Sequence, residues 1–138
     1  MIYGHRERLI RDKLLLPLSE DELCKRKSAD PKQLSKYERY EWIVYRADEW
    51  FRCVDEALND YNRCEKAEII ADHLKAHEAH RLVNELCRSD PQQPKSKNGR
   101  MLGMYKICTF EEWEAWEKDK TQRELKKEFD FKGDANQQ

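Results

Sequence analysis

Apolar residues in the middle of the chain have the spacing of a long helix that packs against several neighbours. Between positions 37 and 61 they recur at alternating intervals of three and four residues, as in a heptad seam. The members of this seam are Tyr37, Tyr40, Val44, Ala47, Phe51, Val54, Leu58 and Tyr61. Because Ile43, Trp50 and Ala57 lie beside the seam and widen it, the pattern predicts a helix over about 31–60.

Capping motifs predict where two further helices begin. Ser19 precedes Glu22 by three residues, and Thr109 precedes Glu112 by the same interval. In such a capping box each side chain accepts a hydrogen bond from the backbone of the other residue. We therefore expect a short helix after the first motif and a C-terminal helix, occupying 109–131, after the second.

The remaining apolar patterns complete a predicted helical bundle. Positions 65–88 carry apolar residues at helical spacing, which predicts an antiparallel partner for the 31–60 helix. A shorter pattern over 6–16 predicts an N-terminal helix that ends before a proline. The predicted fold is all-α, a single domain over 1–131 with four to five helices around the long antiparallel pair. Residues 132–138 are expected to form a disordered tail.

The composition agrees with this prediction. Charged residues make up 40% of the 138 positions, well above the roughly 25% of a typical globular domain. The 27 basic and 28 acidic residues nearly cancel, giving a net charge of −1. Balanced charge at this density is typical of solvated helix faces. With only four glycines and four prolines, the chain is a poor match for a turn-rich β-sandwich.

The cysteines and the hydropathy pattern narrow the class of protein further. The five cysteines are widely spaced and form no Cys-x-x-Cys pair, which argues against a zinc ribbon and against a disulfide framework. No apolar stretch approaches the roughly 18 residues that a membrane span needs, and the N-terminus lacks the pattern of a secretory signal. We therefore expect a cytoplasmic protein that has no membrane partner.

Three histidines are the candidates for a metal site. His73, His77 and His80 would share one face of the predicted 65–88 helix. A pair of histidines four residues apart can bind one zinc ion. The outer two, however, would lie about 10.5 Å apart along the helix axis, so all three could not easily bind one ion. A structural role is the favoured interpretation, and a metal-dependent enzyme using this face is an alternative.

Other signs of catalysis are absent from the sequence. The chain has no glycine-rich phosphate loop and no Gly-x-Ser-x-Gly nucleophile motif. The acidic residues near 65–72 are better explained as a solvated helix face than as metal ligands. We therefore expect no catalytic residues, no cofactor and no enzymatic activity.

A basic segment offers an alternative function in nucleic-acid binding. Residues 91–108 carry four basic and no acidic side chains and are predicted to be a loop or a short extended segment. The four are Lys95, Lys97, Arg100 and Lys106. Lysine and arginine neutralise backbone phosphates, so this segment could contact DNA or RNA. The acidic net charge of the chain makes this interpretation the second choice.

Aromatic residues on charged surfaces favour a protein partner. Tryptophan and tyrosine in such positions are typical of interface anchors. The candidate partner-binding residues are Trp42, Tyr45, Trp113, Trp116, Leu125, Phe129 and Phe131. The predicted function is a non-enzymatic protein-binding module, a small adaptor or inhibitor of a larger macromolecular machine, of the type encoded by phages or mobile elements. Its partner is expected to be another protein or, as a homodimer, a second copy of the chain.

Overall fold

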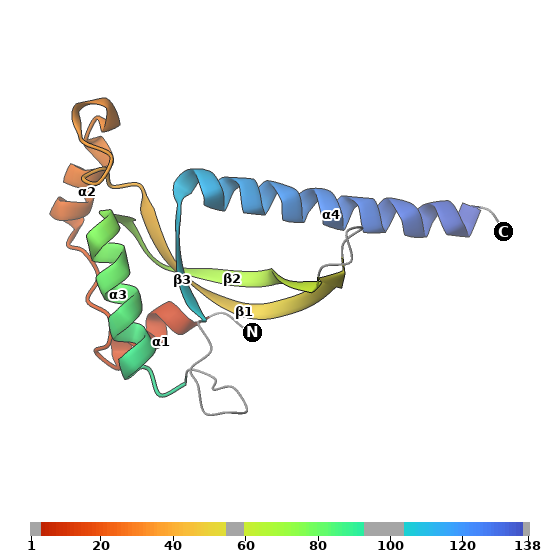
Figure 1. The fold of residues 1–138 in the computed structure, drawn as a ribbon, viewed down its shortest axis with the longest axis horizontal. Helices are drawn as coiled ribbons and strands as arrows, with labels where there is room; N and C mark the ends of the chain where they lie inside the picture. Colours follow the sequence, from red (N-terminus) through yellow and green to blue (C-terminus); the bar gives the residue numbers. More distant parts are fainter. Residues whose placement is uncertain (1–3, 55–59, 93–103, 137–138) are drawn as a thin grey trace. The chain divides into compact units, whose positions relative to one another are not determined.

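In the residues that the structure describes, the protein is mixed α/β, with a three-stranded antiparallel sheet and four α-helices (Figure 1). The computed structural model describes the backbone of residues 4–54, 60–92 and 104–136. Within these ranges it describes all side chains except those of residues 49–54, 60–63, 65 and 127–136. Within the described residues, 57 lie in α-helices and 33 lie in strands. The predicted all-α fold is therefore wrong, and so is the bundle around a long antiparallel helix pair.

The elements follow one another in a simple order. Two helices and a single 3-10 turn come first, a long hairpin follows, and the chain then forms a helix, a short strand and a last long helix. These are α1 (His5–Arg11), α2 (Glu20–Ser28), η1 (Pro31–Gln33), β1 (Trp42–Val54), β2 (Asp60–Leu74), α3 (Ala76–Ser89), β3 (Tyr105–Thr109) and α4 (Phe110–Asn136). In the sheet the strand order is β2-β1-β3, so β1 is the central strand.

The predicted helix over 31–60 is replaced by η1 and β1. Asp30 Oδ1 accepts a hydrogen bond from the Lys32 amide at 3.0 Å, but only one 3-10 turn follows. In β1 the consecutive residues Ile43 and Val44 are both fully buried. A strand covered on both faces does not alternate between apolar and polar residues. Because the apolar residues of β1 are not confined to alternate positions, their spacing resembles that of a helix.

The predicted helix over 65–88 divides into a strand and a helix. β2 continues to Leu74, and α3 begins only at Ala76. The β1–β2 register pairs Trp42 with Leu74 and Val44 with Ala71, so one residue of β1 faces two residues of β2. This β-bulge contains His73, whose φ of 54° is in the left-handed region. The hairpin therefore ends at an irregular junction that leads directly into α3.

Both predicted helix caps are present. Ser19 Oγ accepts a hydrogen bond from the Glu22 amide at 3.2 Å, and α2 follows. Thr109 Oγ1 accepts one from the Glu112 amide at 3.2 Å, while Glu112 Oε1 accepts one from the Thr109 amide at 3.1 Å. This capping box opens α4, which continues to Asn136 and so includes most of the tail expected to be disordered.

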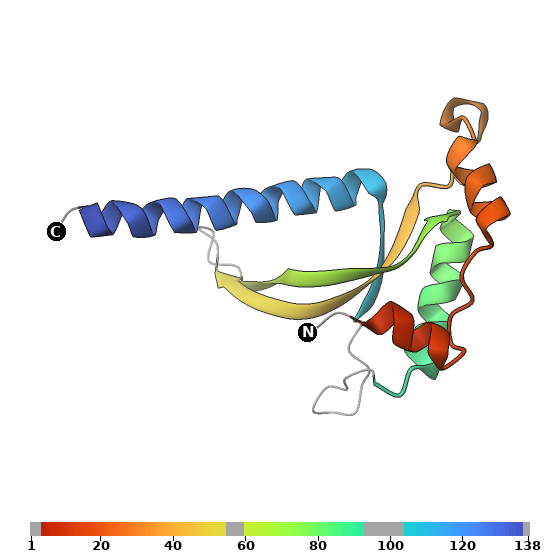
Figure 2. The ribbon, with the colours of Figure 1, turned by 180° about the vertical axis from the view of Figure 1, so that it is seen from behind.

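The chain divides into two compact units, residues 1–108 and residues 109–138. In the first unit, α1 and α3 lie beside the open end of the β1–β2 hairpin (Figures 1 and 2). Side chains from the two helices, the strands and the segment after α1 form its core. The buried members are Leu9, Leu15, Val44, Ile70, Leu74, Ala79, Leu86 and Tyr105.

The end of α1 explains why this helix stops at Arg11 and not near residue 16. The Lys13 amide donates to Ile10 O at 3.1 Å and the Leu14 amide donates to Leu9 O at 2.9 Å, which is the pattern of a Schellman motif. Lys13 has a φ of 62°, at a position where glycine is usual. The turn directs the following segment back to the core, where Leu15 is buried.

Replacing Lys13 by glycine should stabilise the protein. A left-handed conformation costs a non-glycine residue roughly 1–2 kcal/mol, part of which is offset by the greater freedom of glycine in the unfolded chain. We expect Lys13→Gly to raise the free energy of unfolding by about 0.5–1 kcal/mol, as measured by urea denaturation. The matched control Arg11→Gly lies within α1 and should lower it by up to about 1 kcal/mol. Destabilisation by both substitutions would contradict this account of the turn.

Candidate functional site

A buried carboxylate joins four elements of the first unit. Asp90 is the C-cap residue of α3, and its side chain is 0% exposed. Arg8 of α1 donates from Nη1 to Oδ1 at 3.0 Å and from Nη2 to Oδ2 at 2.8 Å. Arg46 of β1 donates to Oδ2 at 3.2 Å, and the hydroxyl of Tyr105 on β3 donates to the same oxygen. These four residues are called the Asp90 cluster.

The Asp90 cluster extends along β1 to the start of α1. Arg46 Nη1 also donates to the Tyr105 hydroxyl at 3.1 Å, and its guanidinium lies 5.3 Å from the centre of the Tyr105 ring. Arg46 Nε donates to Asp48 Oδ1 at 3.1 Å, and His5 Nε2 lies 2.9 Å from the same oxygen. Each guanidinium therefore contacts more than one acceptor, which fixes its plane.

Burial and hydrogen bonding together shift the pKa values of this cluster. Burial alone would raise the pKa of Asp90, but hydrogen bonds from Arg8, Tyr105 and the Gln92 amide, together with the charge of Arg8, lower it to about 2. Burial raises the pKa of the Tyr105 hydroxyl to about 12, helped by its hydrogen bond to Asp90 and opposed by Arg46. The hydrogen bond to Asp90 raises the pKa of Arg8.

These pKa values decide what the cluster can do chemically. General acid–base catalysis near neutral pH needs a group whose pKa is close to that pH. Asp90 is ionised and Tyr105 is neutral throughout that range. The carboxylate also accepts from donors on every side, so it has no geometry for removing a proton from a ligand. The arrangement suits a structural role, which is to hold α1, α3, β1 and β3 together.

A second ion cluster holds α2 against the junction of β2 and α3. Arg26 donates to both carboxylate oxygens of Glu78, at 2.9 and 3.0 Å, and to Glu22 at 3.0 Å. It also donates to the carbonyl of His73 at 2.9 Å and lies 4.8 Å from the centre of the Tyr40 ring. Burial would raise the pKa of Glu78, but the bonds from Arg26 and the Lys75 amide lower it.

The candidate metal-binding histidines do not share a helix face. His73 lies in the bulge of β2, whereas His77 and His80 lie in α3 and are exposed. His73 Nδ1 is 2.9 Å from Asp72 Oδ1, and the His80 ring lies 6.4 Å from the Trp42 ring. In the part of the chain that the structure describes, no three His, Cys, Asp or Glu side chains are grouped to hold a metal ion. The i, i+4, i+7 arrangement expected from the sequence is therefore wrong.

The basic segment is only partly within the described residues. Lys95, Lys97 and Arg100 lie outside them, so their prediction as nucleic-acid-binding residues is not examined by the structure. Lys106 lies on β3 and is half-buried. Of the two predicted conformations, the short extended segment is confirmed for 105–108, where β3 runs.

Two candidate partner-binding residues belong to the first unit. Trp42 begins β1, is half-buried and packs against the core, while Tyr45 is half-buried three residues further along the strand. Both residues therefore contribute to the packing of the sheet, and their exposed parts remain candidates for contact with a partner.

The remaining candidates lie on α4. The rings of Trp113 and Trp116 are 5.1 Å apart between centroids, and Trp113 Nε1 donates to Glu117 at 2.9 Å. The Lys120 ammonium lies 5.4 Å from the Trp116 ring. Leu125 is 60% exposed. The side chains of Phe129 and Phe131 lie outside the described residues.

Sequence reasoning missed the Asp90 cluster. Neither Asp90 nor Tyr105 stands out in the sequence, and Arg8 and Arg46 are two among 27 basic residues. The only local signal was that the acidic residue comes at a helix end, where a carboxylate is not favoured by the helix dipole. A carboxylate in that place needs nearby cations, but the sequence alone does not identify them.

Comparisons with known proteins give no relative from which to interpret these clusters. No family model, curated protein or solved structure matches the chain. Among the helices in the described ranges, none is both long enough and apolar enough to cross a membrane. Functional inference therefore rests on the residues themselves.

Replacing Asp90 by asparagine should strongly destabilise the protein. The substitution keeps the size of the side chain but removes the negative charge that Arg8 and Arg46 share, and Arg46 keeps only Asp48 as a counter-charge. Breaking a buried ion pair in this way typically costs about 3–5 kcal/mol. Chemical denaturation should show this loss, whereas Asp119→Asn on the exposed surface of α4 should change stability by less than about 1 kcal/mol. Equal stability of the two variants would contradict the assigned role.

The lowered pKa of Asp90 predicts a specific acid sensitivity. Its ordinary value is 3.8 and its folded value is about 2, so ionised Asp90 favours the folded state. This contribution, about 2 kcal/mol, is fully present above roughly pH 4 and is lost as the pH falls through 2. Because other carboxyl groups titrate in the same range, the measurement is the difference in unfolding free energy between the parent chain and Asp90→Asn. That difference should shrink between pH 4 and 2, and a constant difference would contradict the prediction.

Proposed function

We propose that this protein is a non-enzymatic protein-binding module, acting in the cytoplasm as an adaptor or inhibitor of a larger assembly, and that α4 is its binding element. The observation that carries the proposal is the character of α4 itself. It has 27 residues and belongs to a compact unit separate from the folded core of residues 1–108. At 1.5 Å per residue, such a helix is about 40 Å long.

The pattern of apolar residues along α4 supports a role in binding. Residues 117–124 are all polar, and apolar residues are placed on either side of this stretch. A helix stabilised by packing along its whole length would carry an unbroken apolar stripe. The apolar residues on the C-terminal side of this stretch, which begin at Leu125, are called the distal apolar group. Leu125 is 60% exposed. An isolated helix in water is marginally stable, so a partner surface that covered this group would stabilise it.

The tryptophan pair supports the same proposal at the other end of α4. Trp113 and Trp116 contact each other, and the indole N–H of Trp113 is held by Glu117 one turn later. The Lys120 ammonium lies over the Trp116 ring. These contacts fix the two aromatic rings before any partner arrives. Preorganised tryptophans are frequent hot spots in protein interfaces, since little side-chain freedom is lost on binding.

A charge introduced at Leu125 should weaken partner binding without unfolding the protein. We expect Leu125→Asp to reduce the amount of a specific protein captured from the native host by at least about tenfold, because the burial of an uncompensated carboxylate opposes binding. Quantitative mass spectrometry of the captured material is the measurement. Gln122→Asp is the matched control, since it places the same residue at an exposed position one turn earlier. Equal capture by all three chains would show that α4 is not the binding element.

A truncated chain tests whether the distal end of α4 is needed for binding another protein or for self-association. A chain ending at residue 123 lacks the distal apolar group but keeps the whole of the first unit. Its thermal unfolding should resemble that of the full chain, while partner capture or dimer mass in light scattering should be lost. If the truncated chain both captures the partner and self-associates like the full chain, the proposal fails.

A further inference from the structure

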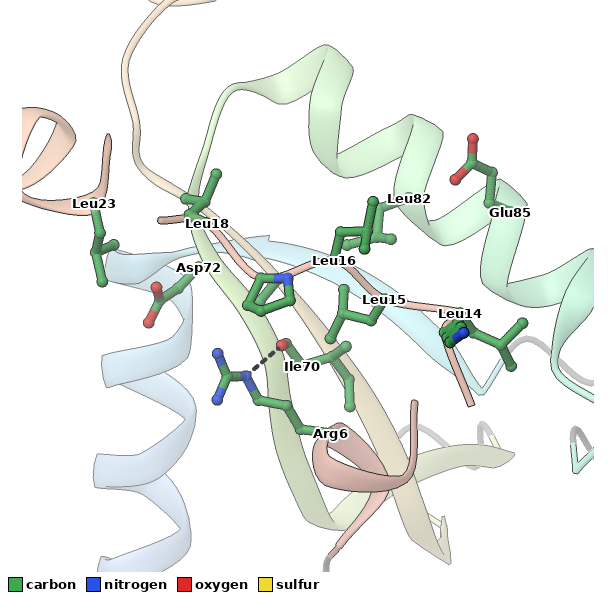
Figure 3. A pocket seen from close by; sticks show the side chains of 13 residues that line it. Arg6, Leu14, Leu15, Leu16, Leu18, Leu23, Ile70, Asp72, Leu82 and Glu85 are labelled. Atoms are coloured by element: carbon green, nitrogen blue, oxygen red, sulfur yellow. Dashed lines mark hydrogen bonds between the residues drawn. The ribbon is translucent and has the colours of Figure 1, made fainter. Parts of the chain in front are cut away.

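A leucine-lined cavity lies in the first unit. Its volume is about 380 Å³, within the size range of small-molecule sites. Its walls come from the segment 14–18 that follows α1, from Leu23 of α2, from Ile70 of β2 and from Leu82 of α3 (Figure 3). We name it the leucine cavity.

Nine of the thirteen residues that line the leucine cavity are apolar. Ile70 is fully buried and Leu15 is nearly so, and both belong to the core. Leu16 is 87% exposed, although it also lines the cavity. A large apolar side chain left so exposed at the rim of an apolar cavity would be covered by the aliphatic part of a ligand.

Arg6 supplies a fixed positive group at this cavity. Its Nε donates to the carbonyl of Ile70 at 3.1 Å, as the dashed line in Figure 3 shows, and its amide donates to Glu68 at 3.1 Å. Within the described residues, its two terminal nitrogens have no protein acceptor. A guanidinium held through Nε keeps its remaining fork of donors in one orientation, which matches a carboxylate.

Arg6 is one of four charged residues that line the cavity, two of each sign. Lys13 adds a second positive charge to the lining. Asp72 also lines the cavity, and its Oδ1 contacts His73 Nδ1 at 2.9 Å. Glu85 lies on α3 at the opposite side of the close-up from Arg6 (Figure 3). An anionic head at Arg6 would therefore be separated from Glu85 by the leucines.

We propose that the leucine cavity binds a linear aliphatic monocarboxylate. The carboxylate accepts hydrogen bonds from the terminal nitrogens of Arg6, and the hydrocarbon chain lies against Leu15, Leu16 and Leu82. This ligand class satisfies the two features of the site together, a fixed guanidinium fork and an apolar wall. The site is independent of α4 and of the proposed protein partner.

Calorimetric titration with sodium decanoate, below its micelle concentration, tests the proposal on the full-length chain. Removing the guanidinium in Arg6→Met should raise the dissociation constant by about tenfold, the effect expected for losing charge-assisted hydrogen bonds. The matched control Arg11→Met makes the same change at an exposed residue of α1 outside the cavity and should leave the constant unchanged. Absence of decanoate binding, or an equal effect of both variants, would overturn the proposal.

Two further measurements keep the test decisive if Arg6→Met does not fold. On the unmodified chain, decanoate should bind more tightly than decylammonium or decanol, and a preference for either of these would overturn the proposal. Leucine-methyl NMR spectra should show shifts at Leu15 and Leu82 but not at Leu125, which is exposed outside the cavity. Ala71→Leu, which adds bulk to the lining, should abolish those shifts. Equal shifts at Leu125, or unchanged shifts in Ala71→Leu, would indicate non-specific binding and overturn it.

Discussion

The carboxylate of Asp90 imposes the strictest constraint on this fold, because a buried ionised group must be met by hydrogen-bond donors. Arg8, Arg46 and Tyr105 meet that need from α1, β1 and β3, respectively. None of these elements is close to Asp90 along the chain, so their hydrogen bonds are formed only in the folded unit. The apolar core holds the helices and the sheet together without fixing their orientation. The Asp90 cluster fixes how the end of α3 is oriented on the sheet.

The two kinds of site have different physical bases. Inside the first unit, charged groups are paired and buried, and their pKa values keep them out of proton transfer near neutral pH. The leucine cavity combines a fixed Arg6 with apolar walls, which suits recognition of a small amphiphile. In α4, by contrast, Leu125 is exposed and the tryptophans form a local pair. This difference is why a partner is proposed for α4 and a ligand for the cavity.

The features predicted correctly from the sequence are those set by neighbouring residues. The caps at Ser19 and Thr109 need only a partner three residues away, so the starts of α2 and α4 were predictable. The identity of β1 depends on burial of both its faces, as Ile43 and Val44 show, and tertiary packing decides that. The histidine face failed for the same reason, since His73 belongs to a bulge defined by pairing with β1. Arg8 and Asp90 are 82 positions apart, and no local pattern joins them.

A double-mutant cycle between Asp90 and Arg8 tests the central claim most directly. Unfolding free energies would be measured in urea for the parent chain, Asp90→Asn, Arg8→Met and the double variant. If the buried pair holds the unit together, each single substitution leaves the remaining side chain without its two-point ion pair. The double variant should then be less destabilised than the sum of the two, by about 1–3 kcal/mol. Additive losses, within about 0.5 kcal/mol, would show that the two side chains contribute independently and would contradict the account.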